Sequence, residues 1–244
     1  AAAALREAVQ GGEGALALTP RPRDAKAAVG DVLVAHPMSC LAQPTLHGSV
    51  VLLVAAEDDD ADGDGEPTLR AEGGFVMGLV VNKPSGVTLG DAATSHGAAR
   101  LGDRLLKSDL FVGGDVSGQT LTAVTSGAAA GPGTEGGAPA WFEDDVVALG
   151  ERCGDAAGEG DAAADDGASK KDAAAADDAA FRIFCGYCGW SAAQLQNEVE
   201  RGVWFLARPE RDDAAAVGLA GASSDSAGAD AWRAALAGLS EDHR

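Results

Sequence analysis

The sequence predicts an α+β protein organised around one sheet. Several apolar segments have the length of β-strands and are separated by turns rich in Gly, Pro and Asn. Helical patterns are fewer, and the clearest one lies between two such strands. A chain of 244 residues can bury a substantial core. Its low-complexity segments reduce the folding portion to about 160–180 residues, which favours a single domain.

Residues 1–28 are expected to form a leader to that domain. The stretch Thr19-Pro20-Arg21-Pro22 contains two prolines, which should prevent regular structure. The domain is then expected over residues 29–240, with acidic inserts at about 57–73 and 154–180. Because these inserts consist mainly of Asp, Glu, Gly and Ala, they bury too little apolar surface to offset the entropy of ordering.

Five segments between the leader and the second insert have the pattern of strands. They are Asp31–Ala35, Ser49–Val54, Gly74–Val81, Leu110–Gly114 and Leu121–Thr125. Most are apolar runs typical of buried strands, whereas the last alternates as a half-buried strand does. Asn82–Gly86 is expected to turn the chain, and Thr88–Asp91 to open a short helix.

The most specific local pattern begins at Phe181. Phe181–Cys185 has strand character, and Gly186–Trp190 is expected to turn the chain. Ser191 followed by Gln194 matches a capping box, in which the hydroxyl accepts from the third helical amide and the Gln side chain reaches back. A helix is therefore expected from Ser191 to about Arg201.

The chain after this helix is expected to return to the sheet. Gly202 suits a left-handed position at a helix C-terminus, and Val203–Leu206 has strand character. Trp232 and Leu236 lie at the spacing of one helical face, so a final short helix should dock on the domain.

Charge and hydropathy restrict the partners of this protein. The formal charge is −20, with 38 acidic and 18 basic residues, so the surface repels nucleic-acid backbones and anionic lipid headgroups. No apolar run approaches the roughly 20 residues of a membrane span, and no lipid-anchor motif is visible. We therefore expect a protein partner, and neither nucleic acid nor a membrane.

An ordered series of motifs carries a family resemblance. Its main members are Gly30–Pro37, Ser49–Leu53, Met77–Pro84, Phe111–Gly114 and Gly186–Ser191, followed by Gln194-Leu195, Glu198, Trp204 and Trp232. In this order the series resembles the AlgH/YqgE family over roughly residues 28 to 240. The sequence differs from the bacterial pattern in its two acidic inserts and in Cys188 within the Gly-Tyr-x-Gly-Trp motif.

The resemblance implies an α+β fold, a pseudo-barrel built from a bifurcated sheet with flanking helices. It also implies a family of bacteria and plastids that has no established catalytic activity, and whose name comes from a proposed regulatory role in alginate synthesis. We therefore expect no catalytic residue, no cofactor and no metal to be inherited. Because the family occurs in plastids and the chain begins with Ala1 instead of Met, the plastid stroma is the expected location, with the bacterial cytoplasm as the alternative.

Cys185 and Cys188 are the redox candidates. Their two-residue spacing is that of thioredoxin-like dithiols, and the expected helix begins shortly after Cys188. The alternative is that Cys185 is a buried strand residue and Cys188 an incidental cysteine of a turn. With Cys40 and Cys153 the chain has four cysteines, which are too few and too unevenly placed for a disulfide framework, and this favours a reducing compartment.

His36, Cys40 and His47 cluster near the end of the first strand. With an acidic residue they could form a metal site or a Cys/His nucleophile, but their spacing matches no strong zinc motif. Solvated or capping histidines are the alternative. His36 is kept as a ligand-binding candidate.

Asn82, Gly113 and Gly114 are the other ligand-binding candidates. Like Lys83, they follow strand ends, where backbone amides can form a nest for a small anion. The alternative is that Asn and Gly simply supply the turn conformations that these positions need.

Three functions are compatible with these patterns. The favoured one is a non-catalytic binding or regulatory protein, because structural motifs are abundant and no convergent catalytic set is visible. The second is a thiol redox-responsive protein or enzyme that uses Cys185 and Cys188. The third, transcriptional control by direct DNA contact, conflicts with the net charge.

Overall fold

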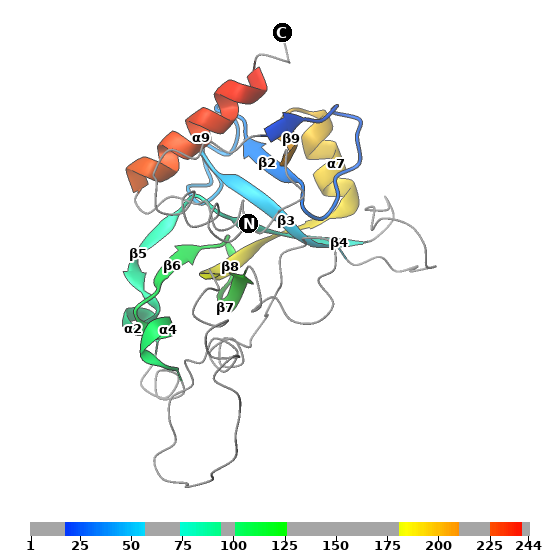
Figure 1. Ribbon diagram of the computed structural model, residues 1–244. Helices are drawn as coiled ribbons and strands as arrows, with labels where there is room; N and C mark the ends of the chain where they lie inside the picture. Colours follow the sequence, from blue (N-terminus) through cyan, green and yellow to red (C-terminus); the bar gives the residue numbers. More distant parts are fainter. Residues whose placement is uncertain (1–17, 57–73, 94–100, 126–180, 210–224, 241–244) are drawn as a thin grey trace, which may run out of the picture.

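The computed structural model describes residues 18–56, 74–93, 101–125, 181–209 and 225–240 (Figure 1). Its strands are β1 (Leu18–Pro20), β2 (Val32–Ala35), β3 (Val50–Ala56), β4 (Phe75–Val80), β5 (Pro84–Thr88), β6 (Asp109–Val112), β7 (Val116–Thr125), β8 (Phe181–Ser191) and β9 (Trp204–Pro209). Its helices are α2 (Leu89–Ala92), α4 (Asp103–Leu106), α7 (Ala192–Glu200) and α9 (Asp225–Ser240). The expected α+β class is confirmed, and both acidic inserts lie outside the described residues.

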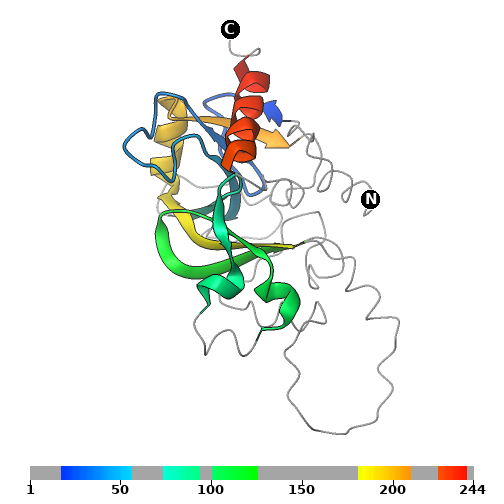
Figure 2. The ribbon, with the colours of Figure 1, turned by 90° about the vertical axis from the view of Figure 1, so that its left-hand side faces the viewer.

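The nine strands form one mixed sheet that branches at β8. The order is β1-β9-β2-β3-β4-β8-β6-β5, and β7 also pairs with β8. One half of β8 pairs with β4, where Gly78 lies opposite Cys188, and the other half pairs with β6 in parallel and with β7 in antiparallel orientation. Figure 2 shows β7 and β8 side by side as long curved strands. The branch confirms the expected bifurcated sheet, and the path of the described strands is not closed.

Helices cover the sheet at three places. Figure 1 shows β2 and β3 between α9 and α7. Alternate residues of these strands face opposite ways: Val32, Val34 and Leu52 belong to the core cluster that includes α9, whereas Leu33 and Val51 belong to the cluster that includes α7. A third cluster lies between β6, β8 and the two short helices α2 and α4. The period-two alternation of the strands therefore supplies a core on each side.

The N-terminal segment joins the sheet earlier than expected. Leu18–Pro20 forms β1 and pairs with β9, although two prolines were expected to prevent regular structure. Pro20 is compatible with this position because β1 is an edge strand with one open side. Beside it, Asp31 is fully buried and its carboxylate accepts hydrogen bonds from Arg21 and Arg208, which joins the leader, β2 and β9.

The expected turn at Gly186–Trp190 was wrong. β8 runs without a break from Phe181 to Ser191, because β4, β6 and β7 supply hydrogen-bond partners that the local sequence does not reveal. Gly186 adopts φ +73°, so the strand is locally irregular at the residue expected to start the turn.

The capped helix after this strand is confirmed. The Ser191 hydroxyl accepts from the Gln194 amide at 3.1 Å, and α7 ends at Glu200 with Gly202 at φ +73°. The capping box is only half formed, because the Gln194 side chain donates to Glu198 Oε1 at 2.9 Å instead of reaching back. The side chain thus contributes to a cavity described below.

Other boundaries differ by a few residues. The expected Asn82–Gly86 turn is shortened because β5 already begins at Pro84. Thr88 caps the short helix α2 as expected, whereas α4 had no recognised signal. The terminal helix α9 is longer than expected and begins at Asp225. No helix in the described part of the chain is long and apolar enough to cross a membrane.

Candidate functional site

Two cavities lie on either side of the loop between β2 and β3. This loop, residues 36–48, contributes Pro44, Thr45 and His47 to one cavity. It contributes Cys40, Gln43 and Leu46 to the other. We name them the Lys83 cavity and the Glu198 cavity after their central charged residues.

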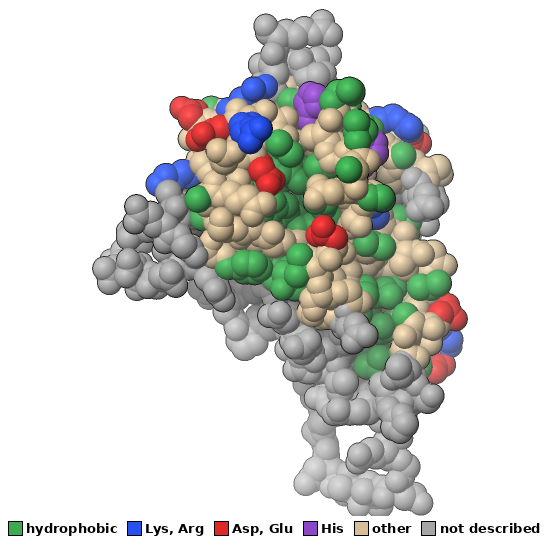
Figure 3. Space-filling model, turned by 180° about the vertical axis from the view of Figure 1, so that it is seen from behind, with side chains coloured by type: hydrophobic (Ala, Val, Ile, Leu, Met, Phe, Trp, Pro, Cys, Tyr) green, Lys and Arg blue, Asp and Glu red, His purple; other side chains and the backbone are tan. Residues whose placement is uncertain are grey.

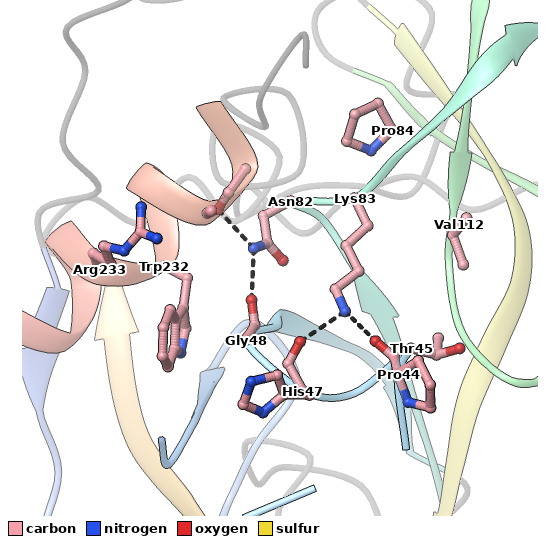
Figure 4. Close-up of a pocket in the computed structure, with 12 residues that line it drawn as sticks. Pro44, Thr45, His47, Gly48, Asn82, Lys83, Pro84, Val112, Trp232 and Arg233 are labelled. Carbon is pink, nitrogen blue, oxygen red and sulfur yellow. Dashed lines mark hydrogen bonds between the residues drawn. The ribbon is translucent and has the colours of Figure 1, made fainter. Parts of the chain in front are cut away.

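The Lys83 cavity has a volume of about 510 Å³ and is built by three parts of the chain that are distant in sequence (Figure 4). The loop forms one wall, the junction of β4 and β5 forms a second with Asn82, Lys83 and Pro84, and α9 forms a third with Trp232 and Arg233. Its volume falls within the usual range of small-molecule sites.

The side chain of Asn82 connects the three walls through hydrogen bonds. Its side-chain oxygen accepts from the Val50 amide at 2.8 Å, and its nitrogen donates to the carbonyls of Gly48 at 3.0 Å and Gly228 at 2.9 Å. The residue is 3% exposed. Its amide group is therefore occupied by the backbone, which makes Asn82 a support of the cavity and explains why an Asn follows β4.

Lys83 and Arg233 bring positive charge to the cavity. The Lys83 ammonium group donates to the carbonyls of Pro44 at 2.6 Å and His47 at 2.7 Å, so the lysine also holds the loop. Arg233 reaches the cavity from α9 and pairs with Asp230 at 2.7 Å, both side chains being mostly exposed. No carboxylate is among the described residues that line this cavity.

The Glu198 cavity has a volume of about 410 Å³, and its central charged residue is acidic, whereas that of the Lys83 cavity is basic. Glu198 Oε2 accepts from the indole nitrogens of Trp190 at 3.1 Å and Trp204 at 2.8 Å, and Oε1 accepts from Gln194. The two indoles are 5% and 2% exposed and meet edge to face. Glu198 is thus the shared acceptor that satisfies two buried indole donors.

The redox candidates occupy separate environments. Cys188 is buried in the cluster beneath α7, and its thiol donates to the Gly113 carbonyl at 3.6 Å. Cys185 is half-buried beside the third cluster and donates to the Gly118 carbonyl at 2.9 Å. Burial raises the pKa of both thiols, that of Cys188 to about 12. A thiol pair of low pKa gains no support from this arrangement.

Gly113 and Gly114 lie where two backbones cross closely. A Cβ atom on Gly113 would stand 2.2 Å from the Gly186 carbonyl oxygen, and one on Gly114 would stand 2.0 Å from the Tyr187 carbonyl carbon. Gly113 also donates to the Cys185 carbonyl at 2.8 Å and accepts from Val80 at 2.7 Å. Close packing against β8 therefore accounts for both glycines.

His36, Cys40 and His47 do not form a common centre. The Nδ1 atom of His36 accepts from the Met38 amide at 3.1 Å, and its ring packs against Phe205. Cys40 faces the Glu198 cavity, where burial raises the pKa of its thiol, whereas His47 faces the Lys83 cavity. Within the described ranges, no three His, Cys, Asp or Glu side chains are placed to hold a metal ion.

Comparison with known proteins identifies the family. The family model described as AlgH-like matches residues 32–244. The chain belongs to the AlgH-like family. A UPF0301 protein of Streptomyces coelicolor is 30% identical over 186 residues, which cover 75% of this chain and 77% of the relative. A UPF0301 protein of Chlorobium phaeobacteroides is 55% identical over 31 residues, which cover 13% and 17% of the two chains.

Two solved structures are also similar to this AlgH-like chain. The crystal structure of protein DIP2367 from Corynebacterium diphtheriae has a TM-score of 0.49 and 18% identity, covering 85% of each chain. The solution structure of the AlgH protein from Pseudomonas aeruginosa has a TM-score of 0.45 and 22% identity, covering 74% of this chain and 77% of that one.

Sequence reasoning found part of the Lys83 cavity and missed the rest. Asn82 and Lys83 follow a strand end in the sequence, and both line the cavity. Arg233 carries no comparable local signal, and only the docking of α9 brings it to the same place. Glu198 was recognised as a residue of the family motif. Its hydrogen bonds to both Trp190 and Trp204 could not be predicted from the sequence, because they depend on the fold.

Proposed function

We propose that this AlgH-like protein is a non-catalytic regulatory protein that binds a protein partner through the 36–48 loop. The observation that supports this proposal is the exposure of Met38 and Leu41, at 74% and 61%. Among the described residues they are the most exposed large hydrophobic side chains, and they lie in the same loop. Clustered exposed apolar side chains mark interaction surfaces more often than single ones do.

Hydrogen bonds hold the loop in place near both of its ends. The Ser39 hydroxyl is within hydrogen-bond distance of the His36 and Val203 carbonyls, at 2.9 and 2.8 Å. Lys83 holds the other end through two carbonyls. An anchored loop loses little conformational entropy on binding, which favours recognition by its apolar side chains.

The neighbouring surface is consistent with such a contact. His36 and His47 are the histidines of the described residues, and both belong to the loop. Figure 3 shows hydrophobic side chains around the histidines on one face. The partner chemistry that fits is a protein surface with an apolar pocket for Met38 and Leu41, because removing these exposed apolar side chains from water favours association.

A photo-crosslinking residue at position 38 tests the proposal in extract of the source organism. We expect one protein to be captured in defined ratio, and Met38→Ser with Leu41→Ser to weaken its binding about tenfold or more. A crosslinker at position 87 is the matched control, since Val87 is 43% exposed on β5, outside the loop. Equal capture from both positions, or unchanged binding of the double variant, would count against the loop.

The compartment is a separate proposal. We infer the plastid stroma, with the bacterial cytoplasm as the alternative, while the relatives reported above are bacterial. Immunolocalisation of the native protein in source cells distinguishes the two.

A further inference from the structure

We propose that the Lys83 cavity is a binding site for a small organic oxyanion, a carboxylate or phosphate monoester attached to an apolar body. This inference does not depend on the partner contact, because Met38 and Leu41 are not among the residues that line the cavity, although other residues of the 36–48 loop are. It rests on the charge of the lining, on the apolar surface between the charges and on the rigidity of the walls.

The lining concentrates positive charge in a strongly acidic protein. Lys83 and Arg233 both line the cavity, and His47 lies between them on the loop (Figure 4). No Asp or Glu is among the lining residues that the structure describes, although the whole chain carries a formal charge of −20. A concave surface of one sign focuses its field on the enclosed volume and attracts ligands of the opposite sign.

The remaining surface suits an apolar body. Trp232, Pro44, Pro84 and Val112 contribute apolar side chains to the same cavity. The Trp232 indole donates to the Ala35 carbonyl at 2.9 Å, which fixes its ring at the cavity wall. Small-molecule sites commonly combine such an apolar lining with a few fixed polar groups.

Arg233 can meet an anion without rearrangement of the fold. Arg233 pairs with Asp230, and their side chains are 65% and 72% exposed, so this ion pair contributes little and exchanges readily with a ligand. The Asn82 side chain meanwhile forms one hydrogen bond each with Gly48 of the loop, Gly228 of α9 and Val50 of β3, which holds these parts in place. The site is therefore preorganised, which lowers the entropic cost of binding.

Benzoate, phenyl phosphate and benzamide test the ligand class on the full chain. Trp232 lines this cavity, whereas Trp190 and Trp204 line the other, so their indole N–H resonances in NMR spectra report the two cavities separately. We expect benzoate or phenyl phosphate to shift the Trp232 resonance while Trp190 and Trp204 stay unchanged. Benzamide has nearly the shape of benzoate but no charge, and we expect it to bind at least about tenfold more weakly.

Matched variants separate the cavity from general charge effects. We expect Arg233→Gln to weaken binding of the anion about fivefold. Arg201→Gln is the control, because Arg201 is also exposed and lines the Glu198 cavity. The preferred anion, benzoate or phenyl phosphate, distinguishes a carboxylate from a phosphate ligand.

Three results would overturn the proposal. They are an unchanged Trp232 resonance with both anions at millimolar concentration, equal affinity for benzamide and benzoate, and equal losses in Arg233→Gln and Arg201→Gln. Because the partner test changes Met38 and Leu41, which do not line this cavity, its failure leaves these measurements informative.

Discussion

The two cavities beside the 36–48 loop use charge in different ways. In the Glu198 cavity a carboxylate accepts hydrogen bonds from two buried indoles and from Gln194. In the Lys83 cavity an ammonium group donates to two loop carbonyls, and Arg233 meets an exposed carboxylate. A charge enclosed by buried donors serves the fold, whereas partly exposed cations around an open volume can also serve a ligand. The chemistry of the partners, more than the presence of a charge, separates a structural cavity from a binding site.

The largest effect that sharpens this contrast is expected for Glu198→Ala. Removal of the carboxylate leaves the indole N–H groups of Trp190 and Trp204 buried without their acceptor. We expect a loss of about 3 kcal/mol in the free energy of unfolding, because each buried donor that loses its partner costs about 1–3 kcal/mol. Urea denaturation followed by tryptophan fluorescence measures it.

Glu200→Ala is the matched control for this variant. Both glutamates lie on α7 and accept from the glutamine four residues earlier, Glu198 from Gln194 and Glu200 from Gln196 at 3.0 Å. Glu200 is exposed, so we expect a change within about 0.5 kcal/mol. Similar losses in the two variants would show that the indole bonds add nothing to stability.

A smaller effect is expected for Lys83→Met in the other cavity. Methionine keeps most of the apolar stem but removes the donors to the Pro44 and His47 carbonyls. We expect a loss of about 1 kcal/mol, since these carbonyls lie near the surface and water can replace the ammonium group. Lys107→Met is the control, because Lys107 forms an exposed pair with Asp103. A loss for Lys83→Met as large as that for Glu198→Ala would remove the distinction between the cavities.

The fold was predictable where the signal is local. Apolar runs identified β2, β3, β4 and β6, and Ser191 identified the start of α7, because strand burial and helix capping depend on neighbouring residues. Gly186–Trp190 was mistaken for a turn because its glycines resemble one. Its strand conformation depends on pairing with β4, β6 and β7, which are distant in sequence.

The candidate sites were predictable to a smaller extent. Gly113 and Gly114 were ligand-binding candidates, but the structure gives them a packing role, the close approach of β8, which only the fold reveals. The spacing of Cys185 and Cys188 suggested a dithiol, yet both lie in strand β8, where side chains three residues apart point to opposite faces, and they belong to different clusters. Spacing along a chain predicts side-chain proximity only when the local conformation is also known.

The smallest expected effect concerns the reactivity of Cys188, which lines the Glu198 cavity. An unreactive thiol at this place agrees with a structural role for the cavity. Burial raises the pKa of the Cys188 thiol to about 12, with a contribution from the charge of Asp115. At pH 8 a group with that pKa is thiolate in only about one molecule in ten thousand, and the thiolate is the reactive form.

We expect iodoacetamide at pH 8 to leave Cys188 unmodified in the native protein and to modify it fully in urea, as peptide mass spectrometry measures. Cys185 is the internal control, because its side chain is more exposed than that of Cys188. Rapid native alkylation of Cys188 would mean that its thiol is open and ionised, and the cavity would then have to be treated as a reactive site instead of a structural one.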